Sequence, residues 1–153
     1  MGQARRVLFI GYGYVAENTA PPLLAAGWSV SATTRQHERL EPLRGQAVNP
    51  VLADPSCEAG VEALKSALED ADAVISSVPP IEDGDPILAR VPAPAFQHKR
   101  LIYLSTTGVY GDRQGGWAFE RDALTPTSTR SIRRRRSGHC RCPTTREARE
   151  FGE

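Results

Sequence analysis

The chain has 153 residues, 40% of them hydrophobic and 24% charged, and its formal net charge is +1 at pH 7. This composition is ordinary for a globular protein, and the length suits one domain without a large separate substrate-binding lobe. No apolar run approaches the ~20 residues of a membrane span and no leader is evident, so the sequence predicts a cytoplasmic protein without a membrane partner. Three cysteines are too few for a disulfide scaffold.

Short apolar runs alternate with helix-like segments along most of the chain. These runs predict five strands, at residues 7–10, 28–32, 48–53, 73–77 and 101–105. Strands that alternate with helices in this way are typical of a parallel sheet covered on both faces. The sequence therefore predicts a Rossmann-like, doubly wound α/β domain over residues 1–128, with strand order 3-2-1-4-5.

The first predicted strand ends in a turn that contains two glycines. The sequence after Ile10 is Gly11-Tyr-Gly13-Tyr14-Val-Ala16. The glycines allow a sharp turn and the close approach of a diphosphate, and Ala16 fills the third small position of the G-x-G-x-x-G/A fingerprint. Backbone N–H groups at such a turn, with the positive end of the next helix, bind anions. We therefore expect the turn, Tyr14 included, to hold the diphosphate of a dinucleotide.

Prolines complicate two of the connections between strands. The predicted helix over 15–26 contains Pro21 and Pro22, each of which removes a donor and crowds the preceding turn, so we expect it to start late or to kink. The connection over 85–100 contains three further prolines and leaves room for little regular helix. The helix predicted over 58–70 contains no proline, and its apolar side chains recur on one face.

The end of the second strand should select between NAD and NADP. About 20 residues past the fingerprint, where a carboxylate would bind a ribose 2′-OH, the chain has Thr33-Thr34-Arg35 instead. The Arg35 guanidinium can pair with a 2′-phosphate, which favours NADP, while NAD remains possible. Alternatively, Arg35 only opens a solvent-exposed helix with the residues that follow it.

A cluster of hydroxyls follows the fifth predicted strand, in Ser105-Thr106-Thr107-Gly108-Val109-Tyr110-Gly111-Asp112. This cluster lies at the edge of the sheet where open α/β proteins hold their ligands, and a hydroxyl there can polarise a substrate carbonyl. Alternatively, these side chains satisfy backbone groups at a strand end.

Together, the fingerprint, Thr-Thr-Arg, Ser77-Val-Pro79-Pro80 and the Val-Tyr-Gly sequence resemble the short-chain dehydrogenase/reductase superfamily over about residues 5–128. The resemblance is greatest to atypical members of the NAD-dependent epimerase/dehydratase group. It implies hydride chemistry on a small molecule such as a nucleotide sugar, with Thr106 assisting catalysis and Tyr110 nearby. It also implies cofactor contacts at Gly11, Gly13, Ala16, Thr34, Arg35, Ser77 and Pro79.

The chain departs from this superfamily at its usual acid/base pair, Tyr-x-x-x-Lys. The only lysines are Lys65 and Lys99, and the residues four positions before them are Val61 and Ala95. Two functions therefore remain open: an NAD(P)-dependent oxidoreductase or epimerase/dehydratase, and a non-catalytic NAD(P)-binding fragment that lacks the substrate lobe.

The last part of the chain, residues 129–153, differs in composition from the rest. Residues 130–153 carry eight arginines against three glutamates and show no apolar periodicity, so we expect a disordered basic tail. Its Arg, Cys and Pro bias also suits a frame change, with the family-like sequence truncated after about residue 128.

His139, Cys140 and Cys142 in this tail are too few ligands for a closed zinc site, so no metal is expected. The arginines suit nonspecific contact with nucleic-acid phosphates but not specific recognition.

Overall fold

The computed structural model describes residues 4–79, 85–105 and 107–126. The chain divides into two compact units, one from Met1–Val78 with Ile87–Leu104 and the other from Pro79–Pro86 with Ser105–Glu153. Two predictions, the disordered tail and the role of Thr106, fall outside the described residues. In the part of the chain that is described, no helix is both long enough and apolar enough to cross a bilayer.

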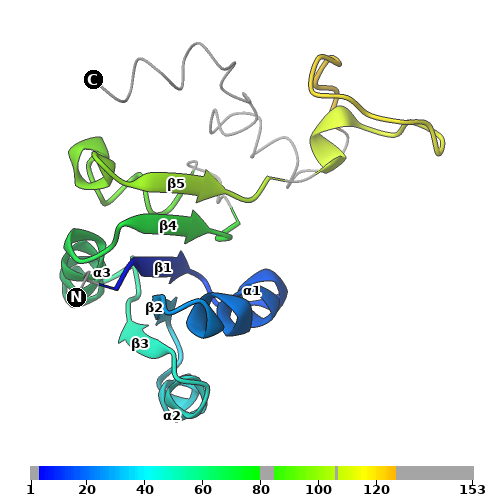
Figure 1. Ribbon diagram of the computed structural model, residues 1–153. Helices are drawn as coiled ribbons and strands as arrows, with labels where there is room; N and C mark the ends of the chain where they lie inside the picture. Colours follow the sequence, from blue (N-terminus) through cyan, green and yellow to red (C-terminus); the bar gives the residue numbers. More distant parts are fainter. Residues whose placement is uncertain (1–3, 80–84, 106, 127–153) are drawn as a thin grey trace. The chain divides into compact units, whose positions relative to one another are not determined.

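The first unit is a five-stranded, all-parallel sheet with helices between its strands (Figure 1). The strands are β1 (Arg6–Ile10), β2 (Ser29–Thr34), β3 (Asn49–Leu52), β4 (Ala73–Ser76) and β5 (Arg100–Tyr103), and the helices are α1 (Tyr14–Ala25), α2 (Leu40–Gly45) and α3 (Glu58–Glu69). Short 3₁₀ turns are η1 (His37–Arg39), η2 (Ala93–Phe96) and, in the second unit, η3 (Thr107–Tyr110). The strand order, β3-β2-β1-β4-β5, confirms the predicted doubly wound fold.

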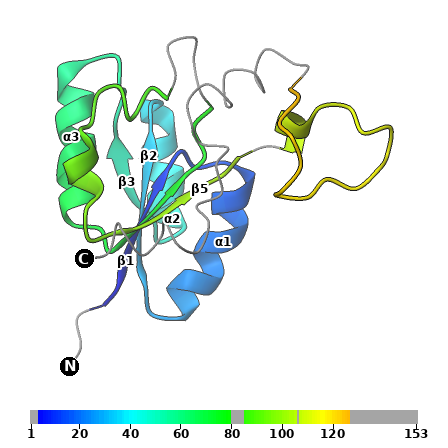
Figure 2. The same cartoon turned by 90° about the horizontal axis from the view of Figure 1, so that it is seen from above.

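The sheet has a hydrophobic layer on each face, because successive side chains of a strand point to opposite sides. Val7 and Phe9 of β1 pack with buried residues of α1 and α2, and Leu8 and Ile10 pack with Leu64 and other residues of α3. Figure 2 shows α1 and α3 on opposite sides of the strands. β1 is therefore buried on both faces, as expected for a continuous apolar run in a parallel sheet.

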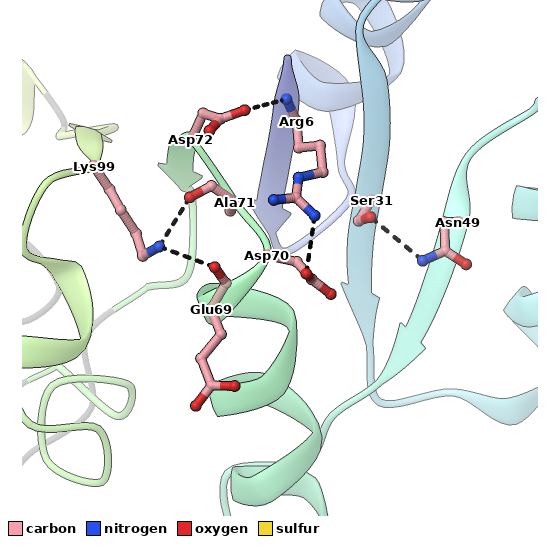
Figure 3. Close-up of polar contacts among 8 residues, drawn as sticks. All are labelled: Arg6, Ser31, Asn49, Glu69, Asp70, Ala71, Asp72 and Lys99. Atoms are coloured by element: carbon pink, nitrogen blue, oxygen red, sulfur yellow. Dashed lines mark hydrogen bonds and ion pairs between the residues drawn. The ribbon is translucent and has the colours of Figure 1, made fainter. Parts of the chain in front are cut away.

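Polar contacts hold the amino ends of the strands (Figure 3). The backbone N–H of Arg6 donates to the Asp72 carboxylate at 2.7 Å, and its guanidinium pairs with Asp70 at 2.9 Å. The Lys99 ammonium donates to the carbonyl oxygen of Ala71 at 2.9 Å. These contacts connect the start of β1 with the residues just before β4, and the residues just before β4 with Lys99, which precedes β5.

Helix α1 corrects one prediction. It begins at Tyr14, directly after the glycine turn, and runs through Pro21 and Pro22 to Ala25, so the predicted late start is wrong. The two missing N–H groups would have reached the carbonyl oxygens of Glu17 and Asn18. Both of these residues are exposed, so water can take the place of the lost donors and the helix remains continuous.

Strand boundaries differ from the prediction by one or two residues. The two-residue differences are at the ends of β2, which continues to Thr34 rather than ending at Ala32, and of β5, which ends at Tyr103 rather than Ser105. Pro50 lies in β3, an edge strand, where a missing donor is tolerated. In 85–100, the described helical structure before β5 is the four-residue η2, as the prolines predict.

The second unit has its own local contacts. The Thr125 hydroxyl donates to the carbonyl oxygen of Tyr110 at 2.7 Å, and Arg113 pairs with Asp122 at 2.8 Å. Gly111 has φ +75°, and a Cβ there would lie 2.2 Å from the Thr125 carbonyl oxygen. The end of η3 is thus packed tightly against the segment around Thr125.

Candidate functional site

The strand order creates a switch point between β1 and β4 at the centre of the sheet. From β1 the chain passes to α1 on one face, and it enters β4 from α3 on the other face. In open α/β sheets, ligands bind in the crevice outside the carboxyl ends of the strands at such a point. Gly11 follows β1 and Ser77 follows β4, so both lie at this crevice.

Gly11 forms the sharp part of the turn. Its φ is +87°, a conformation that side chains disfavour, and a Cβ there would lie 3.0 Å from the Ser77 hydroxyl oxygen. The Gly11 N–H donates to the Thr33 hydroxyl oxygen at 2.9 Å, and the Ser77 hydroxyl donates to the Gly11 carbonyl at 3.3 Å. The turn is therefore fastened to the ends of both neighbouring strands.

Gly13 has a different reason to be glycine. Its φ of −120° and ψ of −161° are open to any residue, but a Cβ there would have no atom of the described chain within 4 Å. Gly13 is the N-cap of α1, and its carbonyl accepts the N–H of Glu17 at 2.9 Å, so the N–H groups of 14–16 have no acceptor within the helix. The lack of described atoms around a Cβ at Gly13, beside these donors, suits a diphosphate, which carries the negative charge that a helix N-terminus attracts.

The two other members of the fingerprint have contrasting surroundings. Ala16 is only 3% exposed and packs with Val7 and Phe9, as expected for the small position where helix meets strand. The Tyr14 side chain is 81% exposed, and its backbone begins α1. A contact between the Tyr14 ring and a cofactor remains a prediction.

At the end of β2, Thr34 and Arg35 differ in how the chain uses them. The buried Thr34 hydroxyl accepts the N–H of Gln36 at 3.1 Å. Arg35 is exposed and lies two residues before the exposed turn η1, which begins at His37, so the alternative interpretation, that Arg35 only opens a solvent-exposed helical segment, stays open. Among the described residues, none forms a hydrogen bond or ion pair with its guanidinium, whereas Arg39 pairs with Glu17 at 3.3 Å. The Arg35 side chain is therefore exposed directly after β2, without a hydrogen-bond or ion-pair partner in the part of the chain that is described.

Asp54 is the carboxylate on which Arg35 has an electrostatic effect. The pKa of Asp54 is lowered from 3.8, mainly because its carboxylate accepts hydrogen bonds from Ser56, with a smaller contribution from Arg35. Asp54 follows β3, so its charge does not take the place of the carboxylate that an NAD site would carry at the end of β2.

The described structure does not test the predicted catalytic residues. Thr106 lies outside the described residues, and Tyr110 ends η3 in the second unit. Pro79 is exposed and also belongs to the second unit. Both lysines are occupied elsewhere: Lys65 pairs with Glu62 at 2.7 Å, and Lys99 binds the Ala71 carbonyl. The catalytic assignments therefore remain predictions.

The sequence analysis missed Thr33 as a site residue. Thr33 is 7% exposed, and its hydroxyl oxygen accepts the Gly11 N–H across the sheet. Its position directly before Thr34, at the distance from the fingerprint where specificity residues occur, was the available signal. Tyr12, by contrast, is structural: its buried ring meets Phe9 edge-on and its hydroxyl donates to Gln46, and burial raises its pKa.

A pocket of about 310 Å³ lies at the opposite, amino edge of the sheet. It is lined by Ala4, Arg5, Trp28, Asp72, Ala73 and Arg100. The Arg5 guanidinium lies 5.7 Å from the centre of the Trp28 ring. Among the described residues, no group of His, Cys, Asp or Glu side chains there or elsewhere could hold a metal ion.

Comparisons with known proteins identify the family of this chain. Residues 6–107 match the family described as NADP oxidoreductase, coenzyme F420-dependent. Protein YeeZ of Escherichia coli K12 is 28% identical over 121 residues, which are 72% of this chain and 44% of YeeZ. The chain thus spans less than half the length of that relative.

Solved structures agree on the fold. A functionally unknown conserved protein from Silicibacter pomeroyi DSS has a TM-score of 0.74 and 30% identity, over 90% of this chain and 48% of its own. A short-chain dehydrogenase/reductase superfamily protein from Agrobacterium tumefaciens, solved with bound NAD, has a TM-score of 0.62 and 18% identity, over 89% of this chain and 44% of its own. The chain therefore belongs to the family of NADP oxidoreductases described as coenzyme F420-dependent, and it has an NAD(P)-binding, Rossmann-like fold.

Proposed function

We propose that this chain is the cofactor-binding part of an oxidoreductase and that it binds a nicotinamide dinucleotide, NADP in preference to NAD. The observation that carries the proposal is the turn from Gly11 to Ala16. It combines a left-handed Gly11, a Gly13 whose Cβ would meet no described atom within 4 Å, and the N–H groups at the start of a 12-residue helix, which have no acceptor within that helix. A diphosphate is the part of the cofactor that this arrangement fits.

The preference for NADP rests on Arg35. Its guanidinium is exposed, follows β2 directly and has no partner among the described residues. A 2′-phosphate on the adenosine ribose would supply a partner through charge-assisted hydrogen bonds. Thr33 and Thr34, the last residues of β2, offer no carboxylate to accept a hydrogen bond from the 2′-OH of NAD.

Titration calorimetry with NADPH and NADH tests both parts of this proposal. We expect NADPH to bind the wild-type chain more tightly, and Arg35→Gln to weaken NADPH binding about tenfold, which is ~1.4 kcal/mol, with little change for NADH. Arg90→Gln is the matched control, because Arg90 pairs with Glu58 of α3. Absence of binding by either nucleotide would contradict the proposal, and an equal loss for both in Arg35→Gln would contradict the role of Arg35.

The bound cofactor would supply hydride exchange, and the residues of this chain would hold its phosphates and ribose. The finer interpretation from the sequence is epimerase/dehydratase-type chemistry, with the Thr106 hydroxyl on the reacting oxygen and Tyr110 as a nearby proton donor. The alternative is a chain that binds the cofactor without turnover, which the lack of Tyr-x-x-x-Lys favours.

Assays of NADPH oxidation with carbonyl compounds, nucleotide sugars and coenzyme F420 as acceptors distinguish a catalytic chain from one that only binds the cofactor. Oxidation that survives Thr106→Val with Tyr110→Phe would contradict the catalytic assignment.

A further inference from the structure

Gly11 is held by two hydroxyls that come from different strands. The Thr33 hydroxyl oxygen, at the end of β2, accepts the Gly11 N–H at 2.9 Å. The Ser77 hydroxyl, just after β4, shares its one proton between the Gly11 carbonyl at 3.3 Å and the Ile10 carbonyl at 3.4 Å. Both polar groups of the one left-handed residue in the turn are therefore bound by side chains.

The contact with Thr33 also decides which N–H groups remain for a ligand. Because the Gly11 N–H already has an acceptor, it is not a donor to phosphate. The available donors are the N–H groups at the start of α1, from 14 to 16. The positions of these donors depend on the backbone conformation at Gly11, which sets the direction of the chain into α1.

We propose that Thr33 and Ser77 are positioning residues that hold the glycine turn in the shape that binds the diphosphate. This inference rests on the proposed function, because it concerns the same site. Thr33 is buried, so without its hydroxyl the Gly11 N–H loses its acceptor at a place where water has little access. The turn would then change its conformation. Part of the binding free energy would be spent on returning it to the shape in which its N–H groups contact the phosphates.

Thr33→Val tests the proposal, because valine keeps the shape of threonine and removes the acceptor. We expect the Kd values for NADPH and NADH to rise together by about tenfold, with their ratio unchanged, since the diphosphate is common to both. Thr33→Ser, which restores a hydroxyl, should bind within about twofold of wild type, and Ser77→Ala should raise both Kd values about threefold. The control is Thr19→Val, because the Thr19 hydroxyl bonds only within α1, to the carbonyl of Val15.

Hydrogen exchange of the Gly11 amide, followed by NMR on the full chain without cofactor, tests the contact independently of binding. We expect exchange about tenfold faster in Thr33→Val and near-wild-type exchange in Thr33→Ser. Unchanged Kd values in Thr33→Val would overturn the proposal, whether or not the Gly11 amide exchanges faster. If Thr33→Val fails to fold, Ser77→Ala decides: unchanged Kd values and unchanged Gly11 exchange would likewise overturn it.

The two proposals fail in different ways. A wild-type chain that binds neither nucleotide contradicts the proposed function, while faster Gly11 exchange in Thr33→Val still shows that Thr33 fixes the turn. A wild-type chain that binds NADPH, with both Kd values unchanged in Thr33→Val, contradicts only the positioning role.

Discussion

Helices α1 and α3 begin at the same edge of the sheet but are built differently at their starts. Each has 12 residues, each follows the carboxyl end of a strand, and neither has a side-chain cap. At α1, a Cβ on Gly13 would meet nothing of the described chain within 4 Å. At α3, a Cβ on Gly60 would lie 2.1 Å from the carbonyl oxygen of Asp54.

The difference distinguishes the proposed binding turn from a structural connection. Around α3 the chain fills the space itself: the Cys57 N–H donates to the Asp54 carbonyl at 3.2 Å and the Ser56 N–H donates to the Asp54 carboxylate at 2.9 Å. Around α1 the turn is held by Thr33 and Ser77, and none of the described residues fills the space next to Gly13. A helix N-terminus is therefore a site only where the loop before it leaves room for a ligand.

The largest expected effect is on stability, at α3. Gly60→Ala should lower the free energy of unfolding by about 3 kcal/mol, because its methyl group would collide with backbone rather than with a side chain that can move. Urea denaturation measures this. Gly45→Ala in α2 is the matched control, because a Cβ there meets nothing within 4 Å. Equal stability of the two variants would contradict the close packing at Gly60.

The second effect is on binding, at α1. Gly13→Asp should weaken NADPH binding about a hundredfold, or ~2.7 kcal/mol, because it places a carboxylate where the diphosphate is expected. Stability should be kept, because Asp is at least as good an N-cap as Gly. Gly13→Asn has nearly the same shape without the charge and should lose less affinity. Tight NADPH binding by Gly13→Asp would show that the diphosphate does not lie at this turn.

The smallest expected effect is on how stability depends on pH, through Asp54 in the loop before α3. Because the pKa of Asp54 is lowered in the folded chain by hydrogen bonds from Ser56, its charge stabilises the fold above the ordinary value of 3.8, and this contribution is lost as the pH falls through the lowered pKa. Asp54→Asn should therefore be slightly less stable than wild type at neutral pH and should converge with it in acid. Urea midpoints across that pH range give the comparison, and a constant difference at all pH values would contradict it.

Local sequence patterns predicted the frame of the site. The apolar run 7–10 followed by Gly11 and Gly13 predicted a buried strand and a glycine turn, and the alternation of strands with helices predicted a Rossmann-like parallel sheet with the order 3-2-1-4-5. These features depend on neighbours in the sequence. The continuous α1 was not predicted, because the cost of Pro21 and Pro22 depends on whether the carbonyls that lose their donors face water.

Contacts between distant segments could not be read from the sequence. Thr33 meets Gly11 because β1 and β2 pair with Phe9 opposite Ala32, a register that the sequence does not state. Glycine is needed at position 60 because a Cβ there would collide with the backbone of Asp54, in the loop after β3. The role of Tyr110 depends on the arrangement of the second unit and on Thr106, so no pattern within β5 or η3 establishes it.

The most direct test is to follow the backbone amides of the ¹⁵N-labelled chain while NADPH is added. We predict that the largest chemical-shift changes occur in residues 13–16, at the start of α1, with small changes at the start of α3. Largest changes at the amino edge, around Arg5, Trp28 and Arg100, or no changes at all, would contradict the claim that the glycine turn binds the cofactor.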